Sequence, residues 1–324
     1  QSVGRHAEGG AESTSPASGS YSAVGAHTGP VTDDAADSDA LTPEEGFALF
    51  GHDLRVSILL ELADAEGRSL PFTELRQRCG ERDSGKFNYH LSKLTGRFVG
   101  HDDESDQYRL TFPGHWVVDA IQHGVIHERA TVESASLPGE CPHCDGPLRF
   151  DYDPQVAGQV RCRDCDRLLV GFPFNPGGLA DRTDREVARA FDTRTRLTWR
   201  QAQRGTCPVC SGRVDTAFDD GDAPTFSTTH DLPVLVTLDC RQCSFLANVP
   251  PGAFLLDHPE IVSFLREHGT DLRNRRLWTL PFVVDPDAVA VESTDPWRVT
   301  VTVAAGETER VAVLDGSVSV TAVE

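Results

Sequence analysis

The chain has 324 residues, of which 39% are hydrophobic, so it can form two or three folded domains. Acidic residues outnumber basic ones 50 to 30, which gives a formal net charge of -20 and disfavours a protein that coats nucleic acid through its bulk charge. The sequence contains no run of eighteen apolar residues and no apolar segment near its start, which argues against a membrane span and a signal peptide. We therefore expect a cytoplasmic protein.

The first 40 residues are rich in Gly, Ser, Ala and Asp and contain no Leu, Ile or Phe. We predict a disordered tail over residues 1–40 and assign it no chemistry. Thr42 and Glu45 form a capping-box pattern around Pro43, which predicts that order begins here with a short helix. A second helix is expected over residues 52–65, where Leu and Ile recur at helical spacing.

Residues 69–72 read as a short extended segment, after which Thr73 is expected to cap a helix that runs to about Cys79 and ends at Gly80. Asp83 or Ser84 is expected to cap the next helix. Its buried face has i, i+4, i+7 spacing and consists of Phe87, Leu91 and Leu94.

Residues 98–101 and 107–111 are expected to pair as strands around a turn at residues 102–106. Three helices followed by a hairpin are typical of a winged helix-turn-helix, with the hairpin as its wing. We extend this domain over residues 41–132, because a further helix is expected over residues 115–131.

Basic residues concentrate in this region. The span 68–100 contains seven Arg or Lys against three acidic residues, and both lysines of the chain lie on the helix that follows Asp83. The face of this helix opposite the apolar stripe, together with Arg97 beyond its end, is the candidate DNA-contacting surface, against the plainer alternative of a solvated amphipathic helix. Its members are Ser84, Lys86, Asn88, Tyr89, Ser92, Lys93 and Arg97.

The segment Phe87-Asn-Tyr-His-Leu-Ser-Lys-Leu94 resembles the Ser-x-Val-Ser-x-His-Leu-x-x-Leu pattern of ArsR-type winged-helix transcriptional regulators, with His90 and Leu91 at the matching His-Leu. The resemblance covers about residues 41–112. It implies sequence-specific binding of double-stranded DNA, with this helix in the major groove and the wing along the backbone. Two features differ from that pattern: the wing tip at 102–106 is acidic, and no Cys-x-Cys sensor motif lies near the helix.

Eight of the nine cysteines form four Cys-x-x-Cys pairs, arranged as two modules that each open with Cys-Pro-x-Cys and close with Cys-Arg-x-Cys. Each module can supply four thiolates to one Zn²⁺, which predicts two structural zinc ribbons. Arginines flank both modules and could offset the negative charge of a zinc–thiolate centre. The candidate ligands are Cys141, Cys144, Cys162 and Cys165 in the first module and Cys207, Cys210, Cys240 and Cys243 in the second. Dithiol redox chemistry and disulfides are the alternatives, and the pairing of the motifs and a cytosolic setting argue against them.

His115, Asp119, His123 and His127 recur every four residues in the helix expected over 115–131. This stripe could ligate a metal between two subunits, although a polar dimer face is the simpler interpretation.

The expected fold is α+β. We place the first ribbon at residues 133–175, a connecting helix at 176–204 and the second ribbon at 205–256. Residues 257–324 are expected to hold a helix at 259–268 and a small antiparallel meander, because Val and Thr alternate over 299–304, 309–314 and 317–323.

No nucleophile, base and orienting group occur at an interpretable spacing, so we do not expect an enzyme. The sequence favours a DNA-binding transcriptional regulator that acts as a homodimer. A zinc-ribbon scaffold that binds proteins of the transcription machinery without reading DNA is the alternative, and a dithiol redox protein is a further one. The acidic, Arg-rich composition is similar to that of halophilic archaea, and residues 41–324 resemble uncharacterised haloarchaeal regulators with this layout.

Overall fold

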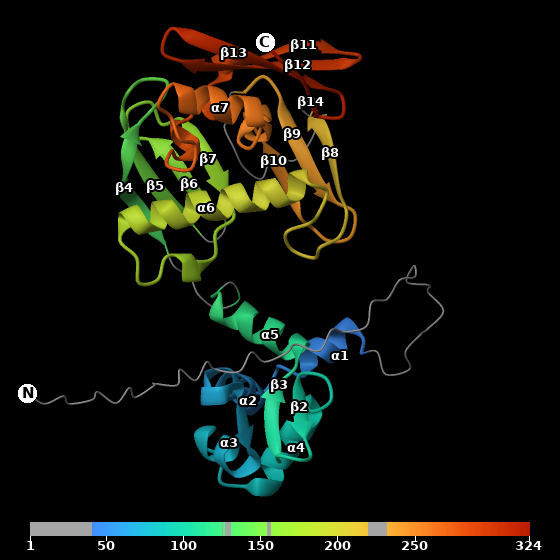
Figure 1. The fold of residues 1–324 in the computed structure, drawn as a ribbon. Coiled ribbons are helices and arrows are strands. Elements are labelled where there is room, and N and C mark those ends of the chain that lie inside the picture. Colours follow the sequence, from blue (N-terminus) through green and yellow to red (C-terminus); the bar gives the residue numbers. More distant parts are fainter. Residues whose placement is uncertain (1–40, 125, 127–130, 154–156, 220–231) are drawn as a thin grey trace, which may run out of the picture. The chain divides into compact units, whose positions relative to one another are not determined.

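The computed structural model describes residues 41–124, 126, 131–153, 157–219 and 232–324 (Figure 1). The tail expected over residues 1–40 lies outside the described residues. The chain has mixed α and β structure with antiparallel sheets, and it divides into two units, residues 1–53 and 54–324. None of the helices in the described ranges has both the length and the apolar character needed to cross a bilayer.

The described part of the first unit holds helix α1, Pro43–Ala48. Its capping box is confirmed: the Glu45 backbone N–H donates to Thr42 Oγ1 at 3.2 Å, and the Thr42 N–H donates to Glu45 Oε2 at 2.9 Å. These two bonds satisfy donors that the first helical turn would otherwise leave free.

Helices and a hairpin alternate at the start of the second unit, in the predicted order. Their bounds are α2 Asp53–Asp64, β1 Ser69–Pro71, α3 Phe72–Arg78, α4 Ser84–Leu94, β2 Val99–Asp102 and β3 Gln107–Leu110. The strands form an antiparallel sheet in the order β1-β3-β2, with His101 opposite Tyr108 and Leu70 also opposite Tyr108. The apolar stripes of α2 and α4 are buried as predicted.

The predicted cap of α3 is wrong. The helix begins at Phe72, its N-cap is Pro71, and no side chain caps it. Pro71 is held in strand β1 opposite Gln107, and the Phe72 ring packs edge-on against Phe87 with 5.2 Å between centroids. These tertiary contacts place Phe72 in the first helical turn, which moves Thr73 inside the helix.

Helix α5, Phe112–Gln122, starts three residues earlier than predicted and is shorter. Thr111 caps it by accepting the Gly114 N–H at 3.2 Å, and Pro113 occupies the first turn, where it removes no helical hydrogen bond. Gly124 follows the helix with φ of +76°, a conformation that suits glycine. Residues 125 and 127–130 of the predicted helix lie outside the described residues.

The described residues between 132 and 324 form three further antiparallel sheets. The first has the order β4-β5-β6-β7, with β4 Val132–Glu140, β5 Pro147–Asp153, β6 Ala157–Cys162 and β7 Leu168–Phe172. The second has the order β10-β9-β8, with β8 Val214–Asp219, β9 Leu235–Cys240 and β10 Leu246–Val249. The third has the order β11-β12-β13-β14, with β11 Val289–Thr294, β12 Trp297–Ala305, β13 Thr308–Asp315 and β14 Val320–Val323. The predicted meander therefore has a fourth strand, β11, that the alternation pattern did not indicate.

Three α-helices accompany these sheets: α6 Asp184–Gln203, α7 Pro259–Glu267 and α8 Pro281–Val284. Within the segment 176–204 expected to hold the connecting helix, α6 begins only at Asp184, because a capping box between Thr183 and Glu186 sets its beginning. Single 3₁₀ turns occur at Glu66–Arg68 (η1), Pro176–Gly178 (η2), Pro251–Leu255 (η3), Leu277–Thr279 (η4) and Pro286–Ala288 (η5).

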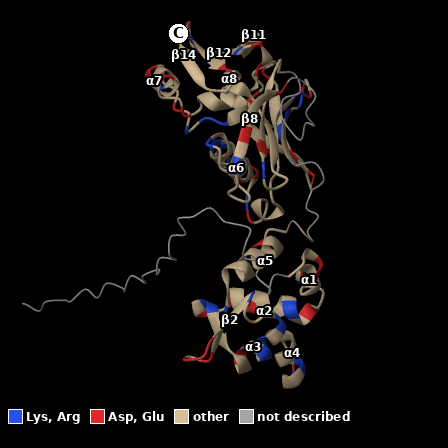
Figure 2. Ribbon diagram, turned by 90° about the vertical axis from the view of Figure 1, so that its right-hand side faces the viewer, with Lys and Arg blue, Asp and Glu red and all other residues tan. Residues whose placement is uncertain are grey.

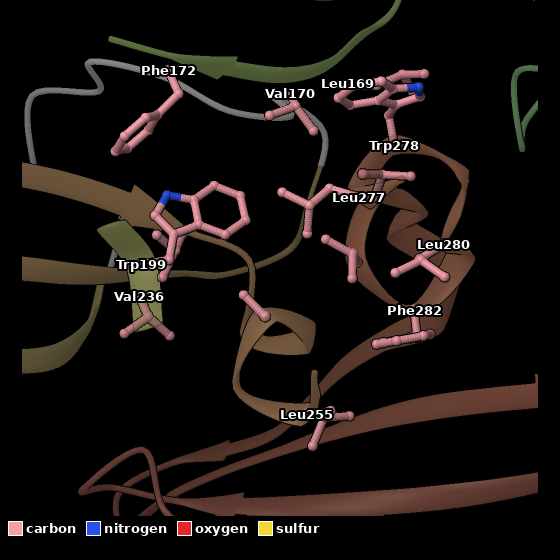
Figure 3. Packing of buried hydrophobic residues seen from close by; sticks show 14 of the residues in the cluster. Leu169, Val170, Phe172, Trp199, Val236, Leu255, Leu277, Trp278, Leu280 and Phe282 are labelled. Carbon is pink, nitrogen blue, oxygen red and sulfur yellow. The ribbon is translucent and has the colours of Figure 1, made fainter. Parts of the chain in front are cut away.

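One continuous cluster of buried residues joins both cysteine-bearing sheets, α6, α7, α8 and the last sheet (Figure 3). Phe191 of α6 is fully buried in this cluster, with ring centroids 5.2 Å from Phe150, 5.6 Å from Phe174 and 6.2 Å from Trp278. Aromatic pairs at these separations add to the stabilisation from apolar burial. The two cysteine modules therefore share a core and do not pack as isolated ribbons.

Candidate functional site

The exposed face of α4 is the first candidate site. Asp83 caps the helix by accepting the N–H groups of Gly85 at 2.8 Å and Lys86 at 3.0 Å, and Thr95 ends it. The buried face consists of Phe87, His90, Leu91 and Leu94. Because this stripe fixes the rotation of the helix, the opposite face is directed to solvent.

All seven residues predicted for DNA contact have exposed side chains: Ser84, Lys86, Asn88, Tyr89, Ser92, Lys93 and Arg97. Figure 2 shows basic residues on α3 and α4. Tyr89 is 57% exposed, and Lys93 Nζ lies 5.6 Å from the centroid of its ring. A basic and aromatic surface on one helical face can contact phosphates and base edges.

Lys86 is already paired with a carboxylate of the same protein. Its Nζ donates to Glu81 Oε2 at 2.8 Å, and this hydrogen bond lowers the pKa of Glu81 to about 2, with the Asp83 N–H contributing. The same partner raises the pKa of Lys86. The ammonium group must therefore exchange one anion for another before it can bind phosphate.

The tip of the β2–β3 hairpin carries acidic residues, as the sequence indicates. His101 lies between two of them, with Nδ1 2.9 Å from Asp103 Oδ1 and Nε2 3.0 Å from Asp106 Oδ1. Its ring stacks on Tyr108 at 4.3 Å between centroids. The tip is thus an organised, exposed cluster of carboxylates.

The first cysteine group lies where β4 meets β5 and where β6 meets β7. The Sγ atoms of Cys141 and Cys165 are 3.9 Å apart, and those of Cys144 and Cys162 are 3.5 Å apart. A backbone turn shapes the first pair, because the Cys141 N–H donates to Gly146 O at 2.8 Å. A Cβ on Gly146 would lie 2.8 Å from Asp164 Oδ2, so the turn has no space for a larger residue.

The second group repeats this geometry. The Sγ–Sγ distances are 3.6 Å for Cys207 and Cys243 and 3.5 Å for Cys210 and Cys240. The Cys207 N–H donates to Gly212 O at 2.8 Å, as in the first module. Gly212 occupies the position in the second module that Gly146 occupies in the first. The internal repeat therefore includes this turn as well as the cysteines.

The residues present fit a four-coordinate metal ion. A tetrahedral centre with metal–sulfur bonds of about 2.3 Å places its sulfur atoms about 3.8 Å apart. The four distances above bracket that value, and all four thiols of each group lie within 4.8 Å of one another. The predicted ligand sets are therefore brought together as two groups positioned to bind a metal ion.

Backbone amides prepare one thiol of each group for deprotonation. Burial raises the pKa of the Cys162 thiol, but the N–H groups of Cys165 and Asp164, together with the thiols of Cys144 and Cys165, lower the pKa to about 7. The Gln242 N–H similarly lowers the pKa of Cys240 to about 7 against the effect of burial. These two cysteines occupy equivalent positions in the repeat. Metal binding requires thiolates, so each site begins with one thiol that ionises readily.

Arginines near the groups bind protein carboxylates. Arg149 Nε donates to Asp151 at 2.8 Å and its Nη2 to Asp166 at 2.7 Å. Arg241 makes two hydrogen bonds to Asp215, at 2.6 and 2.7 Å. These hydrogen bonds stabilise the strands and turns around each group.

The proposed metal stripe of α5 is only partly described. His115 and Asp119 lie within α5, His123 is its C-cap, and His127 lies outside the described residues. The two cysteine groups are the clusters of potential ligands found in the described ranges, and they do not include this stripe.

One charged cluster was not singled out from the sequence. Arginines at positions 189, 196 and 200 share one face of α6 and line a cavity together with residues of the segment 253–276. Their spacing of seven and four residues predicts one helical face, but the sequence could not show that the segment 253–276 lies opposite them.

A profile of the family described as "Domain of unknown function (DUF7351)" matches residues 138–320, more than half of the chain. A second profile, described as "Domain of unknown function (DUF7347)", matches residues 43–121. Among curated proteins and among solved structures, nothing matches.

Proposed function

The chain belongs to the family described as a domain of unknown function (DUF7351), and we propose that it is a sequence-specific DNA-binding regulator of transcription. In this proposal residues 41–132 form an ArsR-like winged helix-turn-helix, and two structural Zn²⁺ ions hold the cysteine-bearing part in shape. The observation that carries the proposal is the exposure of every predicted contact residue on α4 beside a fully buried apolar stripe.

Helix α4 would enter the major groove. Asn88 offers the amide geometry that pairs with adenine, and Lys93 can reach guanine or phosphate. Ser84, Ser92 and Tyr89 carry hydroxyls suited to phosphate oxygens, which would fix the register of the helix on the duplex. The helix order of residues 53–110 and the β2–β3 hairpin support this mode of docking.

Charge limits the affinity at low salt. The acidic hairpin tip repels phosphate, and Glu81 competes with DNA for Lys86. At molar salt the Debye length is about 3 Å, which screens the tip but also weakens the gain from counterion release. Specificity in such a protein would rest on hydrogen bonds and apolar contacts. A dimer would double the number of base pairs read.

Zinc is the metal we propose, because four thiolates at tetrahedral spacing leave no open position and match its structural sites. When bound, the ion cross-links two turns of each module. The chain's own residues supply the rest: the Gly146 and Gly212 turns shape the thiols, and the shared core fixes the strands. We expect about two zinc ions per chain by elemental analysis.

A second candidate function is a scaffold for proteins of the transcription machinery. The exposed carboxylates of the hairpin tip favour it, since they suit a basic protein partner better than a duplex.

The test is genome-wide DNA occupancy at native ionic strength, followed by binding measurements on the sites found. Changing Lys86→Ala with Asn88→Ala should weaken operator binding by about tenfold or more, because each specific base contact contributes about 1–3 kcal/mol. The matched control is Arg185→Ala with Asn274→Ala, which removes the same charge and one amide from exposed positions elsewhere. Unchanged occupancy in the α4 variant with folding intact would refute DNA reading and favour the scaffold.

A further inference from the structure

A cavity of about 300 Å³ opens between α6 and the segment that runs from η3 to η4. The lining of this cavity is mainly basic, which is unusual in an acidic chain. Five arginines and two aspartates line it, a local excess of three positive charges in a chain of net charge -20. The arginines are Arg189, Arg196, Arg200, Arg273 and Arg276.

A buried carboxylate orients two of these arginines. Asp192 is 4% exposed, and its two oxygens have separate partners. Oδ1 accepts the Leu277 N–H at 2.8 Å, which ties α6 to η4. Oδ2 accepts Arg196 Nε at 3.1 Å and lies 3.5 Å from Arg276 Nη1. Arg196 is held further by the bond from its Nη2 to Arg275 O at 2.6 Å.

Donor capacity remains after these contacts. In the part of the chain that the structure describes, no bond of Arg196 Nη1 is found, and Arg200 is paired through Nε with Asp257 at 2.8 Å. Within the described residues no hydrogen bond or ion pair of the Arg189 side chain is found. The Nε2 atom of Gln203, another lining residue, is buried without a partner in the same ranges. A guanidinium presents five N–H donors in a planar fork that matches a carboxylate or phosphate.

Part of the lining is apolar, while the η3–η4 segment also contributes Asp257, Arg273 and Arg276. Leu256 and Leu272 face the cavity from the η3–η4 segment, and Leu197 from α6, where it is 58% exposed. Trp199 also lines the cavity, while its indole nitrogen points toward Phe172 (Figure 3). Concave sites with apolar walls and a few convergent polar groups are typical of small-molecule binding.

We propose that this cavity binds a small organic anion, one that carries a carboxylate or phosphate group on a compact apolar body. Arg189, Arg196 and Arg200 would hold the anionic group, and the leucines would cover the apolar part. A nucleic-acid strand fits less well, because acidic residues flank the arginines: Asp181 and Glu186 line the adjoining cavity beside Arg189, and Asp257 stands at Arg200. A polyanion longer than the cavity would meet these carboxylates. The inference does not depend on the proposed DNA binding.

The test is calorimetric titration of the full-length, zinc-loaded protein with phenyl phosphate and with benzoate, the two sources of the anionic group. Benzyl alcohol is the uncharged control, and a short single-stranded oligonucleotide is a competitor. We expect saturable 1:1 binding of at least one anion and no binding of benzyl alcohol. Inorganic phosphate should compete with the bound organic anion on the unmutated protein, so this measurement needs no variant.

The variant Arg189→Gln with Arg200→Gln should weaken binding at least tenfold. Both side chains are exposed, so folding should survive, which circular dichroism will check. Arg185→Gln with Arg266→Gln removes the same charge from exposed positions outside the cavity and should leave the affinity unchanged. Any one of four results would overturn the proposal. These are an equal loss of affinity in both double variants, no binding of either anion at millimolar concentration, equal binding of benzyl alcohol, or tighter binding of the oligonucleotide at the cavity.

Discussion

Asp192 offers the sharpest test of how this structure is held together, because its two oxygens serve different partners. In the variant Asp192→Asn the amide oxygen can still accept the Leu277 N–H, but the amide NH₂ then faces the Arg196 donor. Hydrogen bonds to charged groups contribute about 1.5–3 kcal/mol. Arg196 and Arg276 are 21% and 25% exposed and can recover some hydration, so the lower half of that range applies.

The variant Asp192→Ala also leaves the Leu277 N–H without an acceptor. Leu277 is fully buried, and an unsatisfied buried donor costs about 1–3 kcal/mol more. The total of about 3–5 kcal/mol agrees with the cost of breaking a buried pair by removing one partner. For a unit of this size, 1 kcal/mol corresponds to about 2–4 °C in melting temperature.

Urea unfolding of the zinc-loaded protein, followed by tryptophan fluorescence, measures these differences. Asp257→Asn is the matched control: it removes a carboxylate from the exposed Arg200 pair and should change stability by less than about 0.5 kcal/mol. If Asn and Ala at position 192 cost the same, the bond to the Leu277 N–H contributes nothing. If the Asn variant is as stable as the control, the reasoning on the ion pair is refuted.

Three further predictions concern the core, the metal groups and α4. Gly158→Ala should destabilise the protein by about 1–3 kcal/mol in the same assay, because the added Cβ would lie 2.8 Å from the Phe191 ring, and a wild-type curve would contradict the packing described. Cys207→Ser should reduce the zinc content from about two ions to about one per chain by elemental analysis. Because the core is continuous, this variant should also lower the unfolding midpoint of the whole cysteine-bearing part. Loss of structure confined to one module would argue against a shared core. Glu81→Gln should raise operator affinity, because Lys86 is released for phosphate. The slope of log affinity against log salt concentration should steepen by up to about one unit. An unchanged slope in binding isotherms would place this lysine outside the interface.

Local chemistry in the sequence predicted much of the fold. The capping box at Thr42, the Asp83 cap, Gly80 after α3 and the buried stripe of α4 are all short-range signals, and the structure has each of them. The metal groups were predictable residue by residue, because the Cys-x-x-Cys spacing fixes which thiols can share an ion. The error at α3 arose because Pro71 pairs with a distant strand and Phe72 packs on Phe87, which overrides the cap chosen from the sequence. The expected start of α5 was too late because Thr111 caps the helix one turn earlier.

What the sequence determined by itself is therefore most of the helices, the membership of the two four-cysteine groups and the exposed face of α4, since helical periodicity and motif spacing are properties of adjacent residues. Only the tertiary structure decided that two cysteine modules share one core, and that arginines spaced along α6 line a cavity with leucines more than fifty residues later. Those features depend on which surfaces are buried together. Burial joins residues across long separations, and no local pattern records which partner a helical face will meet.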